Sequence, residues 1–227
     1  MLRITLVLSA VLALAIPAQS GTVVFDFDNN NSPILSPYGT LPIYQTVGDV
    51  TAKFDGNLSV QDARMVGMNY VTNTVTNVSG YFLFPSGGDS ALSIEFSHLM
   101  TAISFDFATN DISQNGNSRL RMLLYNGSTP VGSPYTDAVG SGESTWSMGT
   151  LQFTSTAGSF NRVSIDILPG QGLGSTFTAD NFGVTLDQSA PPRPNFPADP
   201  NVPEPAGMAV IGLAFIAFAG LRIRTRH

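Results

Sequence analysis

Histidine and paired carboxylates are the side chains that would carry out chemistry in this 227-residue chain. The chain has no cysteine and two histidines, and because His227 ends the chain, His98 is the one histidine in its central region. A Ser-His-Asp triad would have to use His98, and no Gly-x-Ser-x-Gly nucleophile motif accompanies it. A zinc site would need more nitrogen or sulfur donors. We therefore expect a protein that is not an enzyme.

Carboxylate pairs leave one catalytic alternative, the hydrolysis of a glycosidic bond. Glu95 and Glu143 are the glutamates of the central region, and Asp106 and Asp166 are candidate partners. The sequence alone does not place any two of them at the separation that hydrolysis needs. Glycoside hydrolysis is therefore the least favoured of the functions considered.

Three aromatic residues indicate sugar binding, because an exposed ring offers a flat apolar face beside polar groups. Trp146 lies in the polar segment Gly142–Ser147, and Tyr125 and Tyr135 flank the Asn126-Gly127 turn signal. The alternative is that Trp146 fills the core and that the two tyrosines are half-buried sheet residues. Both interpretations stay open at this point.

The elements that position these residues are strands. Ile103, Phe105 and Phe107 alternate with polar or small residues, which is the period-two pattern of a half-buried strand. The same pattern recurs at 22–28, 91–96, 119–124, 162–167 and 182–186, with Gly- and Asn-rich turn signals between. No long window has helical periodicity. The chain is predicted to be all-β, with a single jelly-roll or β-sandwich domain over residues 21–187.

The last of these segments changes phase. Phe177 and Ala179 share one parity, whereas Phe182 and Val184 share the other. A β-bulge near Asp180-Asn181 would produce this change.

Composition limits the function further. Residues 21–201 carry six basic and 15 acidic residues, a net charge of −9. This charge argues against nucleic-acid binding, which depends on basic patches. Residues 188–201 hold five prolines and few groups to bury, which predicts an extended Pro-rich linker.

Both ends of the chain predict export. Arg3 precedes a 13-residue apolar stretch, Ile4–Ile16, and the small residues before Gly21 suit a signal peptidase. Residues 1–20 are therefore predicted to be a signal peptide.

The C-terminal 26 residues have three parts: Val202, Pro203, Glu204 and Pro205; an uncharged apolar run of 16 residues, 206–221; and a basic end, 222–227. The apolar run predicts a transmembrane helix, slightly shorter than a usual span of roughly 17–25 residues. Arg222, Arg224 and Arg226 would then stay in the cytoplasm. A permanent single-span anchor is the alternative to a processed signal.

This three-part tail resembles the PEP-CTERM sorting signal of Gram-negative bacteria. The resemblance implies processing by an exosortase-type membrane enzyme. The protein would pass through the inner membrane and reach the cell surface or an extracellular polysaccharide matrix. We expect a non-catalytic surface or matrix protein associated with exopolysaccharide, with a specific carbohydrate-binding module as the alternative.

The central domain also resembles the lectin-like exported domains that precede such tails, in its segments Thr22–Asp28, Ile103–Phe107, Leu123–Gly127 and Phe177–Val184. In carbohydrate-binding jelly rolls a structural calcium is often held by acidic residues at the bulge and first strand. The resemblance implies that Asp180 pairs with Asp26 or Asp28, with Asn181 or a carbonyl adding oxygen. Two carboxylates with carbonyls and waters suffice for calcium. The alternative is that Asp26 and Asp28 only face solvent and that Asp180 caps a turn.

Overall fold

The structure is a computed structural model of the whole chain. It describes residues 21–28, 41–62, 75, 77–86, 90–109, 119–137, 146–156, 158–168 and 176–197. The predicted signal peptide and the sorting tail from 202 to 227 lie outside these residues, as do Glu143 and the last four residues of the predicted linker. No helix among the described residues is long and apolar enough to cross a membrane.

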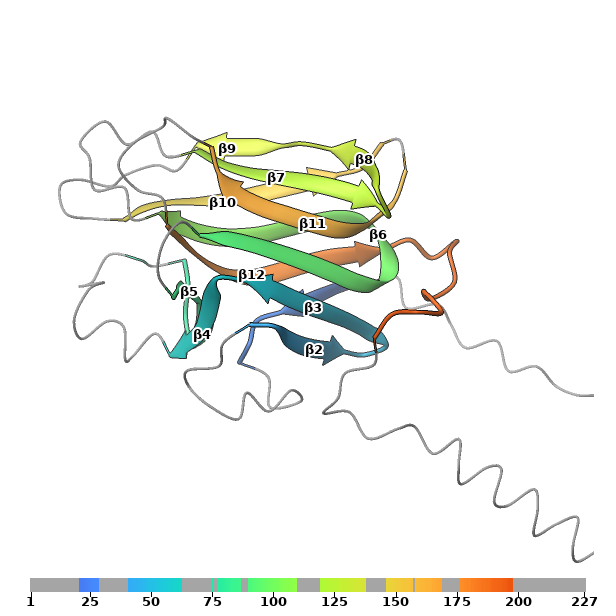
Figure 1. Cartoon of the computed structure of the whole chain (residues 1–227), viewed down its shortest axis with the longest axis horizontal. Helices are drawn as coiled ribbons and strands as arrows, with labels where there is room; N and C mark the ends of the chain where they lie inside the picture. The colour runs from blue at the N-terminus through green and yellow to red at the C-terminus, as the bar shows by residue number, and fades with distance from the viewer. Residues whose placement is uncertain are drawn as a thin grey trace, which may run out of the picture.

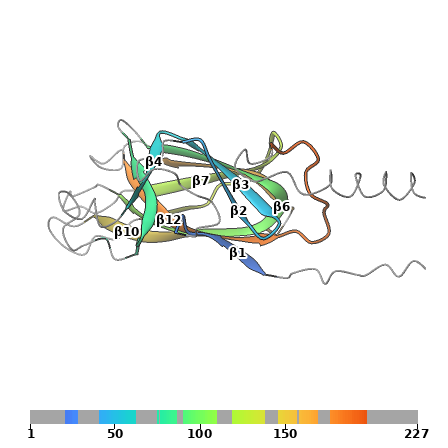
Figure 2. The same cartoon turned by 90° about the horizontal axis from the view of Figure 1, so that it is seen from below.

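Two layers of antiparallel strands form a sandwich, and one strand belongs to both layers. This strand, β6 (Ala91–Thr109), pairs through its first half with β3 (Val50–Gly56) and β11 (Phe160–Ile167). Its second half pairs with β12 (Phe177–Leu186) and β10 (Ser147–Thr154). Figure 2 shows β6 curving between the layers at one end of the domain.

The front layer of Figure 1 runs in the order β2 (Ile43–Val47), β3, β6, β11 and β7 (Arg119–Asn126). Two short strands, β8 (Thr129–Gly132) and β9 (Tyr135–Asp137), pair with the two ends of β7. In the rear layer, β1 (Thr22–Phe25) and then the hairpin of β4 (Leu58–Asp62) and β5 (Tyr81–Pro85) line one side of β12.

Phenylalanine rings fill the space between the layers. Phe54 of the front layer lies 5.4 Å from Phe182 of the rear layer, centroid to centroid, and Phe182 stacks on Phe105 at 4.9 Å. Phe27 contacts both Phe54 and Phe182. All four rings are buried. Burial of this aromatic area supplies the main stabilisation in a domain that has no disulfide.

The predicted all-β sandwich is confirmed, and so is the predicted bulge. The register between β12 and β6 shifts after Asp180, and Asn181 has a φ of 55°. The segments 91–96 and 102–107, predicted as separate strands, are the two halves of β6. The first strand ends at Phe25 rather than Asp28, because Phe27 has a φ of 56°.

The linker is not an extended spacer from Gln188 onward. The backbone N–H of Arg193 donates to the Ser97 carbonyl at 2.8 Å, and its Nη1 donates to the Phe96 carbonyl at 2.9 Å. The Arg193 guanidinium also lies over the Phe196 ring. Residues 188–197 therefore fold back onto the bend of β6. The proline content could not reveal a single arginine that reaches two carbonyls of a neighbouring strand.

Candidate functional site

A continuous row of polar and aromatic side chains crosses the solvent-facing side of the front layer. Tyr44 on β2 pairs with Lys53 on β3, and Lys53 pairs with Glu95 on β6. Glu95 pairs with Arg162 on β11, which pairs with Tyr125 on β7. Paired residues of an antiparallel ladder lie on the same face, so these five form one row, called here the outer row.

Electrostatics agree with this placement. The pKa of Lys53 is raised, mainly by its hydrogen bond to Asp55, with further contributions from Tyr44 and Glu95. At the other end of the row, the Arg162 guanidinium lies 4.6 Å from the centroid of the Tyr125 ring. Among the described residues Arg162 makes no ion pair, and its cross-strand neighbour on the other side is Glu95.

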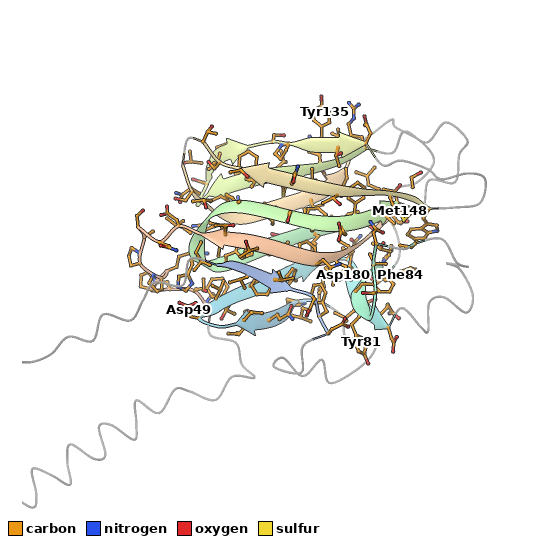
Figure 3. All side chains as sticks on the ribbon, turned by 180° about the vertical axis from the view of Figure 1, so that it is seen from behind. Asp49, Tyr81, Phe84, Tyr135, Met148 and Asp180 are labelled. Carbon is orange, nitrogen blue, oxygen red and sulfur yellow. The ribbon has the colours of Figure 1, made fainter. Side chains whose placement is uncertain are left out.

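Next to the outer row, two arginines are held in forked ion pairs. Arg121 binds Asp166 through two hydrogen bonds of 2.9 and 2.6 Å. Arg119 binds Asp137 through bonds of 2.5 and 3.1 Å, and this contact lowers the pKa of Asp137. Arg119 also lies 4.5 Å from the ring centroid of Tyr135, which is 58% exposed. Figure 3 shows Tyr135 pointing away from the sandwich.

The structure places two of the three predicted sugar-contact residues on one face, with Tyr135 opposite Arg121, four residues along β7 from Tyr125, and places the third in the other layer. Tyr125 and Tyr135 lie on the solvent-facing side of neighbouring strands, each beside an arginine. Trp146 precedes β10 in the rear layer and stacks on Phe84, with ring centroids 6.1 Å apart. Trp146 is partly buried there and does not extend the face that carries the tyrosines.

The predicted calcium residues lie near one another but do not form a metal cage. Asp180 is buried, and its oxygens accept hydrogen bonds from the backbone N–H groups of Ser79 and Asn181 at 3.2 and 2.8 Å. Burial, and less strongly Asp28 and Asp26, raise its pKa to about 7. Asn181 turns to Asp106 instead.

In the described residues, no three acidic or histidine side chains are placed to hold a metal ion. Asp28 Oδ1 also accepts a bond of 2.5 Å from the Tyr81 N–H. Calcium binding by Asp26, Asp28, Asp180 and Asn181 stays a prediction.

Glu95 and Asp166, two of the candidate glycosidase residues, lie too far apart to act as a hydrolytic pair. Glu95 and Asp166 share the solvent-facing side of the front layer, but Asp166 pairs with Ala91, four residues from Glu95 along β6. At about 3.3 Å per residue this offset alone is about 13 Å, beyond the roughly 5–9.5 Å that both hydrolytic mechanisms need. Asp106 belongs to the half of β6 in the rear layer, where it accepts a hydrogen bond from Thr150.

His98 lies at the bend of β6 and is 7% exposed. Its Nδ1 is 2.9 Å from the Ser97 hydroxyl, which also accepts the Thr51 N–H. These contacts fix the bend, so we interpret His98 as a structural residue. It also lines a half-open pocket of about 820 Å³ with the start of β1, the β2–β3 turn and the linker, remote from the tyrosines.

Sequence reasoning missed Tyr44 and Lys53. The 43–47 and 50–56 strands were not predicted, although Lys53 and Asp55 alternate with Ala52 and Phe54 in the pattern of a half-buried strand. Recognising that alternation would have identified a further polar face. It would not have identified the neighbours, because cross-strand pairing is a property of the folded sheet.

No protein-family model and no curated protein matches this chain. Among solved structures, it is similar to the K2 cleaved adhesin domain of Lys-gingipain, with 13% identity over 73% of this chain and 100% of that one and a TM-score of 0.45. It is also similar to the CBM22-1 xylan-binding domain of Paenibacillus barcinonensis Xyn10C, with 11% identity, coverage of 74% and 95%, and a TM-score of 0.36. A family 29 carbohydrate-binding module matches with 12% identity, coverage of 80% and 100%, and a TM-score of 0.31. Because these likenesses are weak, the role of the domain is inferred below from its own residues.

Proposed function

We propose that the domain is a non-catalytic binding domain for polysaccharide, carried by an exported surface or matrix protein. The observation that supports this proposal is the pair of aromatic rings, Tyr125 and Tyr135, each beside an arginine on the solvent-facing side of the front layer. The lectin-like jelly-roll assignment remains part of the proposal.

The chemistry of a sugar suits this arrangement. A pyranose ring has an apolar face of C–H groups that packs on an aromatic ring, while its hydroxyls both donate and accept hydrogen bonds. Arg162 supplies donors beside Tyr125, and Asp137, held by Arg119, supplies an acceptor beside Tyr135. Since the charged groups are pre-positioned by ion pairs and ring contacts, little side-chain entropy is lost on binding.

Retention on immobilised polysaccharides tests the proposal. The domain of residues 21–187 and its single variants Tyr125→Ala and Tyr135→Ala would be run through gels that contain different glycans. We expect one or more glycans to retard the unchanged protein and each substitution to weaken the retardation. Trp146→Ala serves as the control, because Trp146 lies in the other layer. If Trp146→Ala lost binding while the two tyrosine variants kept it, the glycan would bind at a site other than the tyrosines.

Absence of any saturable binding would leave a purely structural role in the matrix. A glycoside hydrolase would instead release reducing ends from a polysaccharide, and Glu95→Gln or Glu143→Gln would abolish this turnover. We expect no turnover, because the candidate partner Asp166 lies beyond hydrolytic distance from Glu95.

The destination of the protein is a second part of the proposal. It rests on the Pro203-Glu204-Pro205 motif, the apolar run after it and the basic end. Mass spectrometry of the C-terminal peptide from the native host tests it. A terminus at or near Pro205 would support exosortase-type processing and delivery to the surface, whereas an intact Arg226-His227 end in the membrane fraction would indicate a permanent anchor.

A further inference from the structure

We propose that the outer row takes an uncharged glycan chain that lies across five strands, with Tyr44 as the contact farthest from Tyr125. This inference rests on the proposed function and specifies the class of ligand, its direction on the sheet and a residue that determines how much of the chain is bound.

The direction of the bound glycan chain follows from the way in which the five strands pair. The outer row runs from β2 through β3, β6 and β11 to β7, perpendicular to the strands. Neighbouring strands are about 4.8 Å apart, so the backbones at Tyr44 and Tyr125 are separated by about 19 Å. An aromatic side chain stands at each end, and charged side chains stand between them. A row of this length suits the interior of a chain, whereas a single terminal sugar would leave most of it unused.

The ligand class follows from the charges. Among the described residues, the solvent-facing side of the front layer carries four cationic and four anionic groups, in a protein with a formal net charge of −6. The cations are Lys53, Arg119, Arg121 and Arg162, and the anions are Asp55, Glu95, Asp137 and Asp166.

Three of these cations are already neutralised. Lys53 lies 2.9 Å from Asp55, and the two forked pairs engage Arg119 and Arg121. The fourth, Arg162, faces Glu95 across the strands. An anionic glycan would have to compete with these carboxylates, whereas an uncharged chain finds alternating donors and acceptors without breaking any pair.

The experiment uses the same domain with neutral and anionic probes. Xylan, galactomannan and mixed-linkage β-glucan are the neutral polymers, and polygalacturonate and alginate are the anionic ones. Oligosaccharides of the best neutral polymer, from disaccharide to octasaccharide, are then titrated by calorimetry against the unchanged protein, Tyr44→Ala, Tyr44→Phe and Tyr125→Ala.

We expect retention by a neutral polymer that is the same at low and high salt, because no net charge is neutralised on binding. Tyr44→Ala should weaken binding of the octasaccharide by about fivefold to tenfold, the loss of one aromatic contact, and leave the disaccharide unaffected. Tyr44→Phe should bind as the unchanged protein does, and Tyr125→Ala should weaken binding of both lengths. Equal unfolding midpoints would show that the variants are folded.

Different outcomes would contradict the uncharged, extended ligand and the proposed polysaccharide-binding function. Salt-sensitive binding to polygalacturonate or alginate alone would overturn the uncharged ligand and keep a polysaccharide-binding domain. An unchanged octasaccharide affinity in Tyr44→Ala would overturn the extended site. Absence of binding to all the polymers would overturn the proposed function itself.

Discussion

The backbone N–H of Ser79 donates a hydrogen bond of 3.2 Å to Asp180 Oδ2, joining the segment before β5 to the bulge of β12. Asp180 is 1% exposed, and burial raises its pKa from 3.8 to about 7. Because the folded-state pKa lies above the unfolded value, folding takes up a proton at this site. The contribution of Asp180 to stability is therefore fully present below about pH 4 and is lost as pH rises to about 7 and above.

Asp180→Asn tests this dependence. Between about pH 5 and about pH 8 the unchanged protein should lose about 2–3 kcal/mol of unfolding free energy through Asp180, a loss that the neutral amide does not suffer. Urea unfolding of both proteins at the two pH values measures the difference. Asp187, whose pKa is lowered by Ser159 and Ser189, provides the matched control. Asp187→Asn should lose as much unfolding free energy between the two pH values as the unchanged protein does. The same loss in Asp180→Asn would contradict the raised pKa of Asp180.

The second prediction concerns calcium binding at Asp180 and Asp28. The oxygens of Asp180 and Asp28 already accept backbone N–H donors. We therefore expect that the thermal midpoint at about pH 8 is the same with calcium and with a chelator, since an ion bound only to the folded state would raise it. A midpoint that rises with calcium and no longer does so in Asp28→Asn would support the ion implied by the resemblance to carbohydrate-binding jelly rolls.

Substitution of Gly56, at the end of β3, is predicted to cause a large loss of stability. Its φ is 147°, and a Cβ placed there would lie 2.1 Å from the carbonyl oxygen of Ala91, a backbone atom that cannot turn aside. Gly56→Ala should therefore cost well over the roughly 1 kcal/mol of an unfavourable φ alone. Gly127→Ala is the control, because its φ is 60° and nothing lies within 4 Å of the added carbon. Similar unfolding free energies for the two variants would rule out the contact with Ala91.

The alternation of Ile103, Phe105 and Phe107 predicted the strand and its buried face, and the phase change after Ala179 predicted the bulge. Both are local signals, since side-chain direction alternates along any strand. The bend of β6 was not predictable in this way. A change in parity near Thr101 marks it, but the pattern does not distinguish one strand that crosses between layers from two strands joined by a loop.

In the candidate site, too, the sequence predicts some features and only the fold reveals others. Tyr125 and Tyr135 were predicted as sugar contacts from residue type, and their neighbourhood in the fold brings them to one face. Trp146 was selected by the same criterion, yet it stacks on Phe84 away from that face. Tyr44 lies 81 positions before Tyr125 in the sequence, and only the pairing of five strands places it on the same row. Residue type therefore indicates candidates, whereas register decides which of them act together.

The fold-back of the linker leads to the last prediction. Arg193 Nη1 donates to the Phe96 carbonyl, and the guanidinium also lies over Phe196. Arg193→Ala removes a charged hydrogen bond and should cost about 1.5–3 kcal/mol if the carbonyl finds no other donor. Arg193→Lys keeps the charge but loses the planar fork, so it should recover only part of this loss. Urea unfolding measures the cost, and limited proteolysis after residue 188 reports whether the linker has detached. If Arg193→Ala were as well protected as the unchanged protein, the linker would stay on β6 without the Arg193 side chain.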